Sequence, residues 1–136
     1  MTPEPPVWNG FTRAALDAAY NNTAAVAHSA ETLANLTALS AITRARYGIR
    51  LDLAYGPAPS EKIDLFSAGK PAAPLFVFIH GGYWQRNAKE MFSALAEGPL
   101  ALGFDVALIG YTLAPEVDLN WIVAECETAV RLLKRE

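Results

Sequence analysis

The feature that most constrains this chain is an apolar run that ends at two glycines. Residues 75–79 read LFVFI, and residues 80–84 continue as HGGYW. Consecutive apolar residues with aromatic and β-branched members predict a buried strand, and the glycines predict a tight loop at its carboxyl end. Ligands of open α/β sheets usually bind outside that end of a strand. The sequence therefore predicts a candidate ligand site at this loop.

The double glycine suits one kind of chemistry in particular. Because glycine has no Cβ, the peptide N–H groups of Gly81 and Gly82 can approach a ligand closely. Such donors suit the negative oxygen that develops when a nucleophile attacks an ester or amide carbonyl. The plain structural alternative is a strand-to-helix turn in which glycine serves geometry alone. The flanking His80, Tyr83 and Trp84 favour the functional interpretation.

The remaining strands predict a mixed α/β sheet. Polar and apolar residues alternate over 50–55 and 62–66 on either side of a Gly-Pro turn, which predicts an antiparallel pair with one solvent-exposed face. Residues 104–110 predict a second mostly buried strand. Since a helix is expected between 75–79 and 104–110, these segments form a βαβ crossover with parallel neighbouring strands.

Helical patterns precede and follow these strands. Apolar residues recur at helical spacing over 12–20 and from Ser29 to Tyr47. Asn87 is expected to cap the crossover helix, with Glu90 reaching back as in a capping box.

The last helix, over 119–135, is amphipathic. Its apolar stripe comprises Leu119, Ile122, Val123, Cys126, Ala129, Val130 and Leu133. Its polar side comprises Asn120, Glu125, Glu127, Arg131 and Lys134. Because Cys126 lies on the stripe, we interpret it as a small buried hydrophobe rather than a nucleophile.

Composition narrows the classes of function. The 136 residues are 52% hydrophobic and 18% charged, which is typical of a globular domain. A net charge of -3 provides no basic face, so nucleic acid is not an expected partner. Without a membrane span or a signal-peptide pattern, we expect a cytoplasmic protein that does not bind membranes. One cysteine and two histidines predict neither a disulfide nor a metal site, and no cofactor is expected.

Several motifs resemble one enzyme family. Residues 80–84 are similar to the HGG-x-W segment of α/β-hydrolase esterases, near the hormone-sensitive-lipase-like enzymes and nearest the kynurenine formamidase (arylformamidase)-like branch. Residues 20–22 (YNN), 98–101 (GPLA) and 111–116 (YTLAPE) fit the same family in the same order. Gly110, where many lipase-like relatives carry Asp, favours the formamidase-like branch. The resemblance spans nearly the whole chain, but only about the first half of such a hydrolase.

This resemblance implies a fold for the chain and a division of the chain into two regions. The expected fold is α/β and is the N-terminal part of an α/β-hydrolase, with an antiparallel first strand pair, parallel central strands and no nucleophile strand. Residues 1–48 would form an N-terminal arm with helices, and 49–136 a partial core. The strand over 75–79 would pair with 104–109 on one side and the nucleophile strand on the other. Without the second neighbour, it would present unpaired peptide groups to another chain.

The resemblance also implies roles for particular residues. Backbone N–H groups of three residues would form part of an oxyanion hole, namely Gly81, Gly82 and Tyr83. His80 would hold the loop by hydrogen bonds rather than act as a base. Trp84 and Tyr83 would line an acyl or aryl pocket, and Tyr20 would help to line it. Packing in the core is the alternative role for these three aromatic residues.

The rest of the chemistry of such an enzyme is not encoded here. The nucleophile of this fold lies in a G-x-S-x-G elbow, and an acid and a histidine follow it. None of the five serines has glycine two residues before it, and no histidine follows His80. We therefore expect that the chain does not assemble a serine triad by itself.

Two hypotheses follow from these observations. The first is the N-terminal portion of a serine hydrolase that cleaves a carboxylic ester or an aryl formamide, completed by a C-terminal half or by self-association. The alternative is a non-catalytic remnant or interaction module that pairs with another chain through its open sheet edge. A nucleotide-binding βαβ unit is disfavoured, because residues 80–82 do not fit G-x-G-x-x-G and no acidic residue ends the strand over 104–109.

Overall fold

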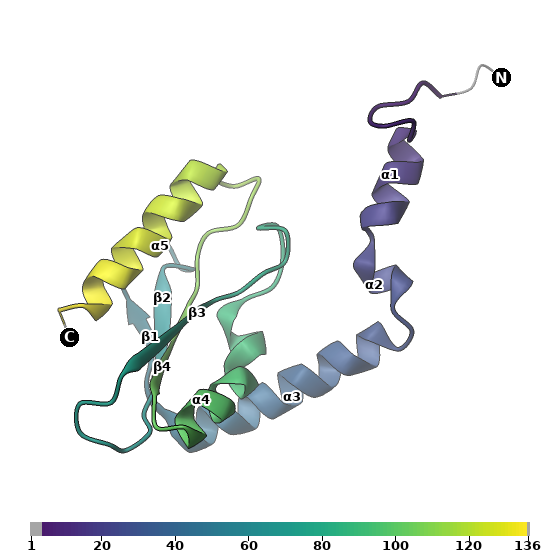
Figure 1. Cartoon of the computed structure of the whole chain (residues 1–136). Helices are drawn as coiled ribbons and strands as arrows, with labels where there is room; N and C mark the ends of the chain where they lie inside the picture. The colour runs from purple at the N-terminus through teal and green to yellow at the C-terminus, as the bar shows by residue number, and fades with distance from the viewer. Residues whose placement is uncertain (1–3, 136) are drawn as a thin grey trace. The chain divides into compact units, whose positions relative to one another are not determined.

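The computed structural model describes residues 4–135 (Figure 1). The chain divides into two compact units, Met1–Ala34 and Asn35–Glu136. The division into 1–48 and 49–136 that the sequence suggests stays a prediction.

The first unit contains two short helices and the start of a third. Helix α1 (Arg13–Tyr20) begins at Thr12, whose hydroxyl accepts a hydrogen bond from the backbone of the first turn. Helix α2 (Asn22–Ala25) begins in the same way at Asn21. Neither helix has a buried residue. Helix α3 (Ser29–Tyr47) begins in this unit and ends in the second.

The second unit is built on a four-stranded mixed sheet with the order β1-β2-β4-β3 (Figure 1). Strand β1 (Gly48–Ala54) pairs antiparallel with β2 (Lys62–Phe66). Strand β4 (Asp105–Ile109) pairs antiparallel with β2 and parallel with β3 (Leu75–Ile79). This arrangement confirms the predicted fold class, including the antiparallel first pair and the parallel neighbours.

Helices cover both faces of this sheet. The 3-10 helix η1 (Lys89–Ala96) and helix α4 (Glu97–Ala101) connect β3 to β4. Helix α5 (Leu119–Leu133) follows β4. No helix among residues 4–135 is both long enough and apolar enough to cross a membrane.

Alternate residues of β4 contact the two helical layers. Val106 and Leu108 pack with Leu100 of α4, whereas Ala107 and Ile109 pack with residues of α5. All four of these β4 residues are completely buried. Because β4 lies between two strands and two helical layers, its continuous apolar sequence is explained.

Strand β3 is less buried than its sequence predicts. Leu75, Phe76 and Ile79 are 41%, 42% and 46% exposed. Within residues 4–135, β3 pairs with β4 alone and is therefore an edge strand. An edge position leaves one row of backbone groups available for pairing.

The prediction that β2 has a solvent-exposed face is wrong. Ile63, Asp64 and Phe66 are all completely buried. Alternation predicted a solvated polar side, but β2 is an interior strand and the Asp64 carboxylate pairs with the side chains of Arg44 and Lys89.

The prediction of a capping box at the crossover helix is also wrong. Helix η1 begins after Ala88, and no side chain caps it. The Asn87 amide instead donates to the carbonyl oxygen of Gly81. Glu90 accepts a hydrogen bond from the Lys89 ammonium rather than from the backbone ahead of the helix.

Candidate active site

The loop after β3 is a tight turn with left-handed backbone angles. Gly82 has φ +130°, Tyr83 and Trp84 have φ 54° and 57°, and Asn87 has φ 77°. A Cβ on Gly82 would collide with the carbonyl oxygen of Arg86. Both its φ and the absence of space therefore require glycine at position 82.

Hydrogen bonds from within the loop and from the segment after β4 hold its carbonyl groups. The Tyr111 hydroxyl donates to the His80 carbonyl over 2.7 Å. The Asn87 amide donates to the Gly81 carbonyl over 3.0 Å, and Nδ1 of His80 lies 3.0 Å from the same oxygen. The Ala114 N–H donates to the Trp84 carbonyl over 2.7 Å. The segment after β4 thus braces the glycine loop.

The imidazole of His80 lies between two aromatic rings. Its centroid is 4.3 Å from that of Tyr111 and 5.9 Å from that of Phe92, and both pairs are stacked. The residue is only 4% exposed, and burial lowers its pKa below the usual value. A neutral ring with the proton on Nδ1 can donate to the Gly81 carbonyl.

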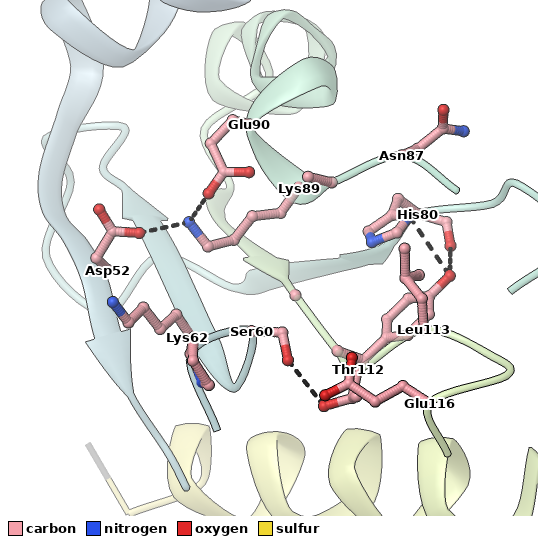
Figure 2. A pocket seen from close by; sticks show the side chains of 14 residues that line it. Asp52, Ser60, Lys62, His80, Asn87, Lys89, Glu90, Thr112, Leu113 and Glu116 are labelled. Carbon is pink, nitrogen blue, oxygen red and sulfur yellow. Dashed lines mark hydrogen bonds and ion pairs between the residues drawn. The ribbon is translucent and has the colours of Figure 1, made fainter. Parts of the chain in front are cut away.

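A polar cavity of about 420 Å³ lies beside the loop (Figure 2). It extends from the start of η1 to the segment after β4 and to the turn before β2. Its polar lining includes Ser60, Lys62, His80, Asn87, Lys89 and Thr112.

An ion cluster closes one side of this cavity. The Lys89 ammonium lies 2.7 Å from Asp52, 2.8 Å from Asp64 and 2.6 Å from Glu90. Arg44 of α3 pairs with Asp64 as well. The hydrogen bond from Lys89 is the main cause that lowers the pKa of the Asp52 carboxyl. The cluster joins the start of η1 to β1 and β2.

A second buried carboxylate lies on the opposite side. Glu125 of α5 is 4% exposed and accepts hydrogen bonds from both the N–H and the hydroxyl of Thr112, over 2.7 and 2.8 Å. The indole N–H of Trp121 donates to it over 3.0 Å. The hydroxyls of Ser60 and Thr112 form a hydrogen bond of 2.8 Å. These contacts hold α5 against the segment after β4.

The prediction that Glu125 lies on the polar side of this helix is therefore wrong. Three donors compensate the burial of its carboxylate, which periodicity alone cannot reveal. On the predicted apolar stripe, Leu119 and Val123 are instead 52% and 57% exposed.

A second hollow, of about 660 Å³, lies between α5 and Ile79 at the end of β3. Its apolar lining includes Ile79, Trp84, Ile122, Val123, Cys126 and Val130. It therefore extends from Trp84, next to the glycine loop, along α5.

Comparison with known proteins shows which proteins this chain resembles in sequence and in fold. No protein-family model matches the chain. It is 35% identical over 82 residues to the kynurenine formamidase of Danio rerio, which covers 59% of this chain and 28% of that protein. It is 39% identical over 84 residues to the kynurenine formamidase of Drosophila melanogaster, covering 59% and 27%. A candidate thioesterase from Silicibacter sp. TM1040 superimposes with a TM-score of 0.83 at 36% identity, over 88% of this chain and 47% of that one.

The chain corresponds to the N-terminal part of an arylformamidase/esterase-like α/β-hydrolase. Esterase B from Lactobacillus rhamnosis shares the fold, with a TM-score of 0.59 at 21% identity over 77% of this chain and 38% of that one. The chain spans under a third of the two formamidases and under half of the thioesterase candidate.

The structure places some of the predicted site residues beside the two hollows. His80 lines the polar cavity and Trp84 lines the apolar hollow. Tyr111, which the sequence did not predict as a site residue, contributes to both. Tyr20 is an exposed residue at the end of α1 in the first unit, and its role in a substrate pocket stays a prediction. Among residues 4–135, acidic, histidine and cysteine side chains form no group of three that could hold a metal ion.

Two residues that hold the carbonyl groups of the loop, Asn87 and Tyr111, were not predicted from the sequence as part of the site. Asn87 was assigned to a helix cap, and Tyr111 was noted only as part of a motif. The partners of both side chains are backbone carbonyls, and no pattern of side chains encodes such contacts.

Proposed function

We propose that this chain supplies the oxyanion-hole loop of a serine hydrolase that cleaves a carboxylic ester or an aryl formamide. One observation carries the proposal. The N–H groups of Gly81 and Gly82 donate to no acceptor within residues 4–135, although the loop is tightly bonded elsewhere. Free N–H donors at the carboxyl end of a strand can stabilise an oxyanion. The Tyr83 N–H is the third proposed donor.

The proposed substrate carries an aromatic group. Trp84 and Tyr83 are 51% and 42% exposed immediately after the glycines, where a planar ring can stack on them. The formamidase relatives are named for kynurenine, an arylamine. N-formylkynurenine is therefore the first substrate to test, and a short-chain aryl ester is the second. The proposed compartment remains the cytoplasm.

The catalytic serine, acid and histidine are proposed to come from a segment that pairs with β3. The exposed edge of β3 and the apolar hollow beside α5 support this, because both adjoin the glycine loop. A complementing C-terminal half or a second copy would cover this side of the sheet.

The test combines the purified chain with a C-terminal half of a relative that carries G-x-S-x-G, an acid and a histidine. Hydrolysis of N-formylkynurenine and of the aryl ester is followed for each part alone and for the combination. We expect turnover only in the combination. Turnover by this chain alone would contradict the assignment of the nucleophile to another segment. A folded complex without turnover on either substrate would contradict the proposed function.

The same experiment addresses the second candidate function, a non-catalytic interaction module. The exposed Phe76 and Ile79 on the edge strand favour it, since an apolar open edge can add a strand from a partner. Strand addition without hydrolysis would support this alternative.

A further inference from the structure

The direction of the two glycine N–H groups follows from contacts made by the carbonyls. In a trans peptide unit the C=O and the N–H point in opposite directions. The N–H of Gly82 therefore points away from the side to which the Gly81 carbonyl is held. In the same way, the N–H of Gly81 points away from the partner of the His80 carbonyl.

The Gly81 carbonyl is held from within the loop. The Asn87 amide and Nδ1 of His80 each lie 3.0 Å from this oxygen. Asn87 adopts φ 77°, a conformation that asparagine tolerates better than most residues. Two positions later, Lys89 is 4% exposed and bonded to three carboxylates, which fixes the chain that carries Asn87.

The His80 carbonyl is held from the next strand. The Tyr111 hydroxyl donates to it over 2.7 Å, and this residue is 3% exposed. Tyr111 lies two residues after the end of the buried strand β4, and its ring is stacked on the imidazole of His80 at an interplanar angle of 13°. Its hydroxyl is thus placed by the packed core rather than by the flexible surface of the loop.

We infer that Asn87 and Tyr111 are positioning residues that direct the N–H groups of Gly82 and Gly81 toward the reacting carbonyl oxygen. Each side chain acts on an N–H group through the backbone carbonyl to which it donates. The geometric part of the inference stands on the contacts above. Its catalytic consequence rests on the proposed function.

The geometric part is tested in the chain itself by residual dipolar couplings of backbone N–H groups. Asn87→Gly keeps the left-handed backbone accessible and removes the donor, whereas Asn87→Asp keeps the shape and replaces the donor by an acceptor. We expect both variants to change the coupling of Gly82 and to leave those of β4 unchanged. Asn120→Asp, at an exposed position of α5, is the control with the same chemical change.

For Tyr111 the chain offers a closely matched control. Tyr111→Phe keeps the stacked ring and loses one hydrogen bond of 2.7 Å to a carbonyl. Tyr55→Phe loses a hydrogen bond of the same length, to the Gly110 carbonyl outside the loop. We expect only Tyr111→Phe to change the coupling of Gly81. Unchanged Gly81 and Gly82 couplings in folded Tyr111 and Asn87 variants would overturn the inference.

The catalytic part is tested in the combination with the C-terminal half. Since one oxyanion donor is worth about 100-fold to 1000-fold in kcat, we expect Asn87→Gly and Tyr111→Phe to lower kcat about 10-fold to 100-fold with little change in KM. The Asn120 and Tyr55 control variants should keep kcat. Changed couplings with unchanged kcat would support the positioning and count against the oxyanion role. Unchanged couplings with a lowered kcat would overturn the positioning and leave the proposed function intact.

Discussion

The Lys89 ammonium lies 2.8 Å from the carboxylate of Asp64, and both side chains are almost completely buried. This pair connects the helix that follows the glycine loop to an interior strand. Asp52 and Glu90 share the same ammonium over 2.7 and 2.6 Å. The loop is therefore held at its end by charges as well as by hydrogen bonds.

Replacing Lys89 should destabilise the fold strongly. Lys89→Met leaves the Asp64 carboxylate buried with a single cation, Arg44, and breaking a buried pair costs about 3–5 kcal/mol. Arg131→Met is the control, because it removes an exposed pair with Glu127 that should contribute less than about 1 kcal/mol. Urea unfolding of both variants measures the difference. Equal losses of stability would contradict the structural role of the cluster.

Stability should depend on pH through His80. Burial lowers the pKa of His80 in the folded state, so the unfolded chain binds a proton first as the pH falls. Stability is then retained above about pH 6.5 and decreases, by up to about 1.4 kcal/mol per pH unit, as the pH falls toward the folded pKa. Denaturant unfolding between pH 5 and 8 measures this slope.

His80→Gln should flatten that slope in the same range. His28→Gln, which replaces the exposed histidine, is the control and should keep the profile of the unmodified chain. A profile that is unchanged in His80→Gln would contradict the assignment of the slope to the buried imidazole.

The open edge of β3 should drive self-association. Phe76 is 42% exposed on this edge, so Phe76→Lys places a charge where a second strand would pair. Sedimentation velocity over a range of concentrations should show less association for this variant. Leu102→Lys introduces the same charge at an apolar residue that is 77% exposed outside the sheet. If both variants reduce association equally, the edge is not the contact surface.

Sequence patterns predicted the elements of this fold better than their environments. The runs over 75–79 and 104–110 predicted strands β3 and β4 and their parallel pairing, because a βαβ crossover has few alternatives. The predicted burial of β3 was wrong, because an apolar run of this kind can form either a central strand or an edge strand. Asp64 and Glu125 bind partners outside their own elements, Lys89 in the first case and Thr112 in the second, so alternation and periodicity predicted both carboxylates to be in solvent.

The candidate site was predictable only where a motif marks it. The HGGYW segment predicted the loop, and the positive φ of Gly82 requires glycine at that position. The contacts of Asn87 and Tyr111 depend on tertiary structure, because each side chain donates to a backbone oxygen. A backbone acceptor leaves no signature in the identity of the residue that carries it.

The most direct measurement of the central claim is kcat of the combined hydrolase with Gly82→Ala. An added Cβ would meet the Arg86 carbonyl at a backbone φ of +130°, so the loop and its N–H groups must shift. Gly69→Ala is the matched control, with a positive φ of 71° and open space around the added carbon. We predict that kcat falls by about 100-fold or more in Gly82→Ala and stays within about twofold in Gly69→Ala. Equal kcat values in the two folded variants would contradict the role of this loop in the reaction.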